Sequence, residues 1–301
     1  MSIADTPKIS IITCFLDTER YIRETIESVV AQDYLNWELL LIDDGSGDSS
    51  TGIAKEFAVQ FPGKIIYLEH EGHINKGASA SRNLGIKKAS GSLIAFLDAD
   101  DVWLPGMLSN LLELMQQHQA AMICEASEYW YDWNDAGRKN EIIPVGAEQD
   151  RLYQPPELMM TLYPLKNGAA PCICGMLVQK KLADKHGAFD DSFSGMYDDQ
   201  SFLVKFYMHE TVYISSSCNN RYRQRPGSLV HSSHQQGAYR QERKYFLKWL
   251  KKYITNNNIK HPGINFLLQQ AMEPYTSRWF ITHTFPAKAK RVWQKVYHSK
   301  K

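Results

Sequence analysis

The chain has 301 residues, 44% of them hydrophobic and 12% aromatic, so it can fill a sizeable core and is not predominantly disordered. Its 34 Lys and Arg residues against 33 Asp and Glu residues give a formal net charge of +1, which argues against a general polyanion binder; we expect no nucleic-acid partner. Five scattered cysteines argue against a disulfide framework and favour a reducing compartment. With neither a signal-peptide pattern nor a run of roughly 18 apolar residues, we expect a cytoplasmic protein, at most peripheral at the inner face of the membrane.

Strand and helix patterns alternate through the first hundred residues. Short β-branched or apolar runs predict strands over residues 8–13, 37–42, 65–68 and 92–97. Apolar residues at helical spacing predict helices over residues 20–31, 50–61 and 78–89. Thr18 is the expected N-cap of the first helix. This alternation predicts an α/β fold with a mostly parallel sheet and helices on both faces.

The pattern loosens after residue 105. We expect a helix over residues 105–118, strands over 121–131 and 172–178, and helices over 180–186 and 201–208, with a loop-rich stretch at 132–170. Beyond residue 237 the chain is helical and basic. No Pro/Gly/Ser-rich linker separates the parts, so we predict one catalytic domain over residues 1–236 with a helical extension over 237–301.

Acidic clusters follow two of the predicted strands. Asp43 and Asp44 come after the second strand, and Asp98, Asp100 and Asp101 come after the fourth. In an open α/β sheet, ligands bind beyond the carboxyl ends of the strands. Carboxylates this dense repel one another unless a cation binds, and Mg²⁺ or Mn²⁺ prefers such oxygen ligands together with phosphates. The alternative is an acidic turn that caps the next helix; two clusters at corresponding strand ends favour function.

Two common nucleotide motifs are missing. The glycines near residue 45 do not have the spacing of the dinucleotide-binding fingerprint, and no phosphate-binding loop of the G-x-x-x-x-G-K-[ST] type occurs. A carboxylate–metal clamp on a diphosphate remains as the main option.

Three segments in order, residues 9–50 with the motif DDGS, 75–108 with SRN and DADD, and 187–206 with a DD pair, give the chain a specific resemblance. From residue 8 to about 231 it resembles a family 2 glycosyltransferase of the GT-A (Rossmann-like) fold. The resemblance implies a metal-dependent, inverting transfer of sugar from a nucleoside diphosphate, expected to be UDP, to an acceptor hydroxyl. It also implies Mn²⁺ or Mg²⁺ as cofactor, a saccharide or lipid-linked acceptor, and a place in bacterial surface polysaccharide synthesis.

The resemblance also implies residue roles around the donor. Base-pocket positions are Thr13 and Phe15 at the end of the first strand, with Asp44 accepting a hydrogen bond from the imide N–H of the base. Residues expected near the nucleotide and metal are Arg82, Asn83, Asp98 as ribose or metal ligand, and Asp100 as principal metal ligand. Asp101 is acidic in the family too, with a less defined role.

The acidic pair Asp198-Asp199 matches the family's pair before a helix, which is usually Glu-Asp. Asp199 is then the implied general base, because a carboxylate that takes the hydroxyl proton makes a sugar alcohol a better nucleophile. Without the resemblance, an N-terminal helix cap would be the favoured interpretation of this pair.

Two arginines and two histidines in the segment over residues 219–234 are further candidates for the site. Arg223 and Arg225 are candidates for bidentate contact with the diphosphate, against the alternative of solvated arginines on a strand. His231 or His234 is a candidate for a further metal ligand, although surface histidines are the default.

Three features are given a lower weight. Cys172-x-Cys174 lacks a second Cys/His pair for zinc, so buried cysteines are favoured. The aromatic residues Tyr129, Trp130, Tyr131 and Trp133 offer a stacking surface for an acceptor sugar, or ordinary packing. Residues 240–254 form a basic helix, with an apolar stripe expected to comprise Tyr245, Phe246, Trp249 and Leu250. That stripe either docks on the catalytic domain or lies on an anionic membrane surface.

Two other functions stay open. One is a catalytically silent protein that binds sugar nucleotides or glycans on the same scaffold. The other is a sugar-phosphate nucleotidyltransferase, for which the first loop, CFLDTER, lacks the expected glycines and basic charge.

Overall fold

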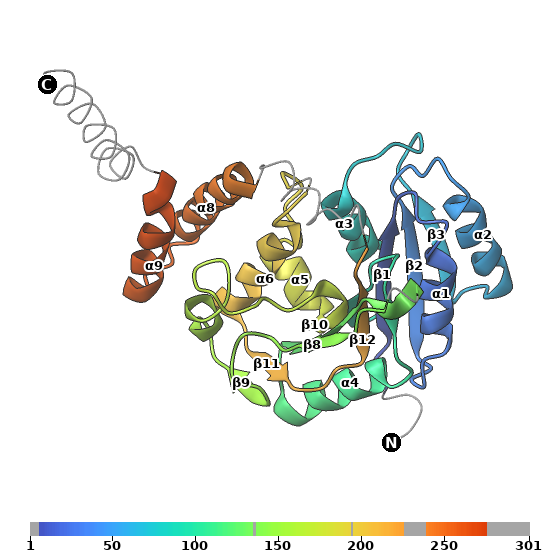
Figure 1. Ribbon diagram of the computed structural model, residues 1–301, viewed down its shortest axis with the longest axis horizontal. Coiled ribbons are helices and arrows are strands. Elements are labelled where there is room, and N and C mark those ends of the chain that lie inside the picture. Colours follow the sequence, from blue (N-terminus) through green and yellow to red (C-terminus); the bar gives the residue numbers. More distant parts are fainter. Residues whose placement is uncertain (1–5, 135–136, 194, 226–238, 276–301) are drawn as a thin grey trace, which may run out of the picture. The chain divides into compact units, whose positions relative to one another are not determined.

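The computed structural model describes residues 6–134, 137–193, 195–225 and 239–275 (Figure 1). The chain divides into two compact units, residues 1–236 and residues 237–301, and each is described by itself.

The first unit is built on an eight-stranded sheet with the order β3-β2-β1-β4-β10-β6-β11-β9. Its strands are β1 (Ile9–Phe15), β2 (Trp37–Asp43), β3 (Ile65–Glu69), β4 (Leu93–Phe96), β6 (Met122–Glu125), β9 (Arg151–Tyr153), β10 (Met176–Gln179) and β11 (Val212–Ser215). Strands β3, β2, β1 and β4 are parallel, whereas β10 is antiparallel to both its neighbours. The sheet is therefore mixed, and its parallel half is the part that the alternating sequence pattern predicts.

Helices cover both faces of this sheet (Figure 1). They are α1 (Ile22–Val30), α2 (Ser50–Gln60), α3 (Ala78–Lys88), α4 (Met107–His118), α5 (Lys180–His186) and α6 (Asp198–His209). Alternate β1 side chains, such as Ile9 and Ile11, join one core with residues of α1, α2 and α4. On the other face, Phe96 of β4 makes edge-to-face contacts with Phe189 and with Phe202 of α6. The opposite directions of neighbouring strand side chains thus create two cores, one on each face.

A second, four-stranded sheet has the order β5-β12-β7-β8. It consists of β5 (Val102–Trp103), β12 (Asn220–Arg223), β7 (Ser127–Trp130) and β8 (Glu141–Ile143). The strand predicted over residues 121–131 is two strands, β6 and β7, which belong to different sheets. The sequence did not predict this sheet, because its strands have two to four residues and pair across long sequence separations.

Short 3₁₀ turns, η2 (Asp132–Asn134), η3 (Glu157–Met160) and η4 (Ile173–Gly175), lie in the second half of this unit. The strand predicted over residues 172–178 was therefore wrong in its first half, where η4 precedes β10. The N-cap prediction for Thr18 was also wrong. Tyr21 precedes α1, and the Thr18 carbonyl oxygen accepts hydrogen bonds from the backbone N–H groups of Tyr21 and Ile22 in a turn that leads into the helix.

The second unit contains α8 (Tyr239–Asn256), α9 (Pro262–Met272) and the 3₁₀ turn η5 (Glu273–Tyr275). The buried stripe of α8 consists of Phe246, Leu247, Leu250 and Ile254. Tyr245 was expected in this stripe but is 49% exposed, because it precedes the row at positions 246, 250 and 254 by one residue, a rotation of about 100°. None of the described helices combines the length and the apolar character needed to cross a membrane.

Candidate functional site

The carboxyl ends of β1, β2 and β4 meet at one edge of the large sheet, because these strands are parallel neighbours. Two acidic segments leave the sheet there. Asp44 follows the last residue of β2, and Asp98 lies two residues after the end of β4. The fold therefore brings together carboxylates that lie more than fifty residues apart in the sequence.

Asp44 fastens a neighbouring loop to the end of β2. Its carboxylate accepts hydrogen bonds from the backbone N–H groups of Lys76 and Gly77, at 2.8 and 3.0 Å, and from the hydroxyl of Ser81, at 3.0 Å. His70 Nε2 lies 3.6 Å from the same carboxylate. A carboxylate has about four acceptor positions, and three donors already use those of Asp44, so about one is left for the predicted hydrogen bond from the base.

Arg82 joins the two acidic ends of the site. Its guanidinium donates to Asp98, with a distance of 2.8 Å, and to Asp198 at the start of α6. The Arg82 side chain is 8% exposed, and the ring of Phe189 lies 5.4 Å from its guanidinium carbon. A buried guanidinium with two carboxylates has its charge balanced and its fork held in one orientation. Asp98 and the pair Asp198-Asp199 consequently border the same region.

Asp199 is partly buried in the first turn of α6. Burial raises the pKa of Asp199 to about 6, and the nearby charge of Asp198 contributes in the same direction, against the hydrogen bonds that Gln200 donates. Those bonds come from the backbone N–H and the side-chain amide of Gln200, at 2.7 and 3.2 Å. A carboxylate with a pKa near neutrality is better suited to accept a proton than an ordinary aspartate.

The loop that follows β4 carries the remaining acids. The Asp100 carboxylate accepts a hydrogen bond from Nε of Arg225 at 2.6 Å. Burial raises the pKa of Asp100; Arg225 opposes this and Asp98 adds to it. Asp101 is fully buried, and one of its carboxylate oxygens accepts the backbone N–H of Arg223 at 2.8 Å. Asp100 and Asp101 therefore point to different surroundings, although they are adjacent in sequence.

Arg223 holds this loop instead of reaching outward. Its Nε donates to the backbone oxygen of Asp100 at 2.6 Å, and its terminal nitrogen pairs with Glu24 of α1 at 2.6 Å. The Arg223 side chain is 2% exposed. The prediction that Arg223 contacts the diphosphate is not supported by this geometry, because the side chain is buried and two of its nitrogens are bonded to Asp100 and Glu24.

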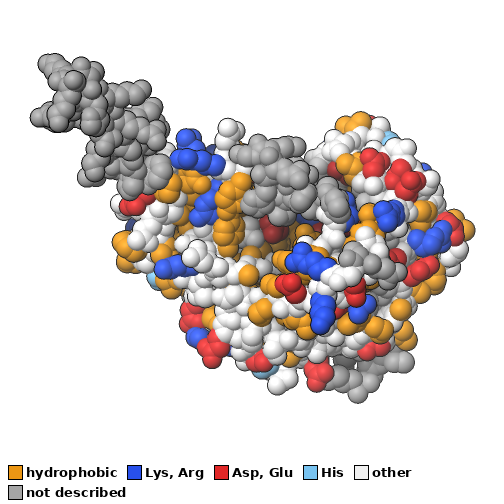
Figure 2. Space-filling model, viewed as in Figure 1, with side chains coloured by type: hydrophobic (Ala, Val, Ile, Leu, Met, Phe, Trp, Pro, Cys, Tyr) orange, Lys and Arg blue, Asp and Glu red, His pale blue; other side chains and the backbone are white. Residues whose placement is uncertain are grey.

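Aromatic side chains surround Arg223, the last residue of β12, and Arg225, which lies two residues later. The guanidinium carbon of Arg223 lies 4.3 Å from the ring centre of Trp130 and 5.1 to 5.2 Å from those of Trp133 and Tyr21. Arg225 lies 5.3 Å from the Tyr21 ring. Figure 2 shows basic and acidic side chains close together over the region of β12. Trp130 and Trp133 thus contribute cation–π contacts to the site, and their expected role toward a sugar stays a prediction.

Other predicted residues lie within or behind this region. Thr13 and Phe15 are 0% and 2% exposed as whole residues, and Phe15 belongs to the core under α1, so neither side chain is open to a base. The side-chain amide of Asn83 bonds with the backbone of Phe189 and with the Asp191 carboxylate, and so holds the segment before α6. His231 and His234 lie outside the described residues.

The donor set fits a hard divalent cation. Arg82 contacts Oδ1 of Asp98 and Arg225 contacts Oδ2 of Asp100, which leaves the other oxygen of each carboxylate as a candidate ligand. Oxygen ligands of this kind suit Mg²⁺ or Mn²⁺, which complete their coordination with water and phosphate oxygens.

The sequence did not single out several residues that shape the site. Tyr21 and Glu24 come from α1, and Ser81 from the start of α3. Cys14 on β1 faces the same group of charges: burial raises the pKa of its thiol to about 11, and Arg82 opposes this. The only signal in the sequence for Cys14 was its position in the strand. Thr13 and Phe15 point to one face of β1, so Cys14 between them points to the opposite face.

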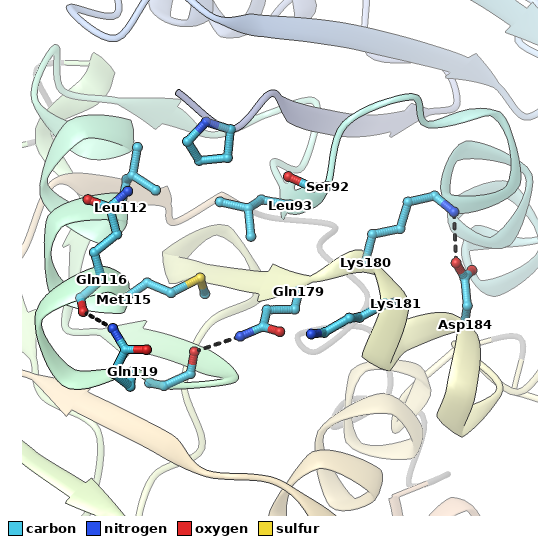
Figure 3. Close-up of a pocket in the computed structure, with 12 residues that line it drawn as sticks. Ser92, Leu93, Leu112, Met115, Gln116, Gln119, Gln179, Lys180, Lys181 and Asp184 are labelled. Atoms are coloured by element: carbon cyan, nitrogen blue, oxygen red, sulfur yellow. Dashed lines mark hydrogen bonds and ion pairs between the residues drawn. The ribbon is translucent and has the colours of Figure 1, made fainter. Parts of the chain in front are cut away.

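A hollow of about 530 Å³ lies at the opposite edge of the sheet, where β4 begins and the antiparallel β10 ends (Figure 3). Its floor includes Leu93 and Met115, and Lys180 on its rim pairs with Asp184 at 2.8 Å. The acids described above do not line it, so it is separate from the candidate site.

Most of this chain is similar to known proteins. The profile of Glycosyl transferase family 2 matches residues 10–187, more than half of the chain. Glycosyltransferase GlyA of Streptococcus pneumoniae is 29% identical over 228 residues, which are 74% of this chain and 31% of GlyA. The chain thus spans about a third of the length of this relative.

Solved structures show the fold. TarS residues 1–349 from S. aureus has a TM-score of 0.64 at 17% identity, covering 92% of this chain and 74% of that one. Its complex with UDP-GlcNAc gives 0.57 at 19%, covering 75% and 61%. Mannosyltransferase PcManGT from Pyrobaculum calidifontis, with GDP-Man and Mn²⁺, gives 0.58 at 15%, covering 88% and 69%. These likenesses confirm the predicted GT-A fold, and with the profile match they establish that the chain belongs to glycosyl transferase family 2.

Proposed function

We propose that this chain is an inverting glycosyltransferase that moves a sugar from a nucleoside diphosphate to an acceptor hydroxyl. The observation that carries the proposal is the bridge from Arg82 to Asp98 and Asp198, because it draws the acidic loop after β4 and the start of α6 into one site. Similar structures were solved with UDP-GlcNAc and with GDP-Man, which supports a nucleotide-sugar donor. We take residues 1–236 as the catalytic domain.

In the proposed reaction, Asp199 accepts the proton of the acceptor hydroxyl while the oxygen forms a bond to the anomeric carbon. The bond from that carbon to the diphosphate oxygen breaks on the opposite side, and this gives inversion. The raised pKa of Asp199 suits it to receive this proton near neutral pH. A divalent cation held by Asp98 and Asp100 would offset the negative charge on the departing diphosphate.

The remaining parts of the proposal concern substrates. UDP is the proposed nucleotide, with Asp44 and the backbone around Thr13 and Phe15 near the base. We propose that Arg225, whose side chain is 25% exposed, can exchange its ion pair with Asp100 for a contact with the diphosphate. The proposed acceptor is a saccharide or a lipid-linked carrier in surface polysaccharide synthesis.

The test is nucleoside diphosphate release from a panel of UDP- and GDP-sugars, with Mn²⁺ and with a chelator. We expect metal-stimulated release from one donor and a loss of about 10²- to 10⁴-fold in Asp199→Asn with donor binding retained. Asp184→Asn is the matched control, since Asp184 lies on α5, lines the separate hollow and pairs with Lys180. A protein that binds UDP without releasing it from any donor would be a silent binder, and unchanged transfer by Asp199→Asn would remove Asp199 as the base.

A further inference from the structure

We propose that Asp101, Cys172 and Cys174 form a binding site for Zn²⁺, distinct from the oxygen ligands Asp98 and Asp100. One ligand atom from each of the three residues lies within 4.8 Å of the other two. The two sulfur atoms are 3.0 Å apart. The cysteine pair lacks a second Cys/His pair in sequence, and the fold supplies a third ligand from the loop after β4, about seventy residues earlier.

The Asp101 carboxylate is the observation that points to a ligand. Its side chain is fully buried, and its Oδ1 accepts the backbone N–H of Arg223 at 2.8 Å. Its Oδ2 is buried and has no hydrogen-bond partner among the described residues. A buried carboxylate oxygen without a partner carries a large desolvation cost, which a bound cation would remove.

The ligand types select the metal. Two thiolates favour a thiophilic cation such as Zn²⁺, whereas Mg²⁺ and Mn²⁺ favour the oxygen ligands of Asp98 and Asp100. Zinc–sulfur bonds of about 2.3 Å in a tetrahedral site place two sulfur atoms about 3.8 Å apart, so the two thiols must separate by less than ~1 Å. Cys172 directly precedes η4 and is only partly buried, which gives its side chain that freedom. Water completes the fourth position.

The site would brace the acidic loop. Asp101 follows Asp100, and its backbone N–H donates to the backbone oxygen of Asp98 at 3.0 Å. On the other side, the backbone oxygen of Cys174 accepts the indole N–H of Trp103 at 2.8 Å. A metal between Asp101 and the two thiols would therefore tie the loop after β4 to the segment before β10.

Cobalt provides a probe that separates this site from the oxygen site. The full chain, reduced and stripped with a chelator, is titrated with Co²⁺ alone, because only thiolate ligands give a sulfur-to-cobalt charge-transfer band in the near ultraviolet. We expect one equivalent of Co²⁺ to produce this band and Zn²⁺ to abolish it by displacement. Asp100→Asn should keep the band, since Asp100 is not a ligand here.

Cysteine variants decide the assignment. Cys172→Ser and Cys174→Ser should each lose the band and weaken Zn²⁺ binding by more than about 100-fold, since even outer partners of metal ligands contribute about 10- to 100-fold. Cys218→Ser is the matched control and should keep both, because Cys218 is outside the cluster. Near-ultraviolet circular dichroism checks that each variant is folded. A fully reduced wild-type chain without the band, or a band that persists in Cys174→Ser, overturns the proposal. These readouts require no transfer activity, so they are independent of the proposed function.

Discussion

The guanidinium of Arg82 donates to the carboxylate of Asp198, which lies 116 residues later in the chain. The same side chain pairs with Asp98, so one buried cation connects α3, the loop after β4 and the start of α6. Each of these segments carries a residue proposed to act on the donor or the acceptor. The position of Asp199 relative to the loop after β4 therefore depends on Arg82.

Arg82→Met should destabilise the protein by about 3 kcal/mol, because it leaves two partly buried carboxylates without their cation. Urea unfolding measures the change. Arg151→Met is the control: Arg151 is 46% exposed and pairs with two exposed glutamates, so its loss should cost no more than ~1 kcal/mol. Equal changes in the two variants would contradict a special role for the Arg82 bridge.

The rate of transfer should fall as the pH drops through about 6, the raised pKa of Asp199. The sign follows from the role: below its pKa the carboxyl is protonated and cannot accept the proton of the acceptor. The pH profile of kcat/KM measures this. Asp198→Asn should move the acid limb to lower pH, since it removes a neighbouring negative charge that raises the pKa of Asp199. A wild-type rate that stays constant down to about pH 4, the range of an ordinary aspartate, would contradict the assignment.

The parallel half of the sheet could be predicted from the sequence for a physical reason. Strands such as β2 are buried along their whole length, and the helices between them have apolar residues at helical spacing, so local pattern and tertiary burial agree. The acidic segments could be placed too, because they directly follow these strands. Topology alone then brings Asp44 and Asp98 to one edge.

The partners of those acids could not be predicted. Arg223 was a candidate for contact with the diphosphate, yet it is surrounded by Glu24 of α1 and the ring of Trp130 in β7, neither of which is near it in sequence. Likewise, nothing near Cys172 in sequence indicates Asp101. Pairings across long sequence separations depend on how short strands associate, and two- to four-residue strands carry too little periodicity to show it.

Arg225→Gln should tighten binding of Mn²⁺ alone by several-fold and weaken binding of the nucleotide-sugar. The first effect follows because Arg225 contacts the Asp100 carboxylate and competes with a cation for it; the pair is 25% and 19% exposed, which corresponds to about 1 kcal/mol at most. The second follows because, in the wild-type protein, a bound cation would free the guanidinium of Arg225 to bind the diphosphate, and glutamine lacks that charge. Calorimetric titration with Mn²⁺ and with UDP separates the two. Weaker Mn²⁺ binding in the variant would show that Arg225 supports the metal site rather than competing with it.

Gly45→Ala should cost about 2 kcal/mol of stability and weaken donor binding. Gly45 has φ +87°, and a Cβ there would lie 2.9 Å from the backbone nitrogen of Asn75. The clash pushes away the loop whose N–H groups bind Asp44, so the acid proposed to face the base loses its support. Gly52→Ala is the matched control, because Gly52 lies within α2 with open space around its Cβ position, and alanine there should stabilise by up to ~1 kcal/mol. Urea unfolding and UDP titration measure both variants. If both alanine substitutions change the free energy of unfolding in the same direction, the claim that position 45 requires glycine to keep the loop next to Asp44 is contradicted.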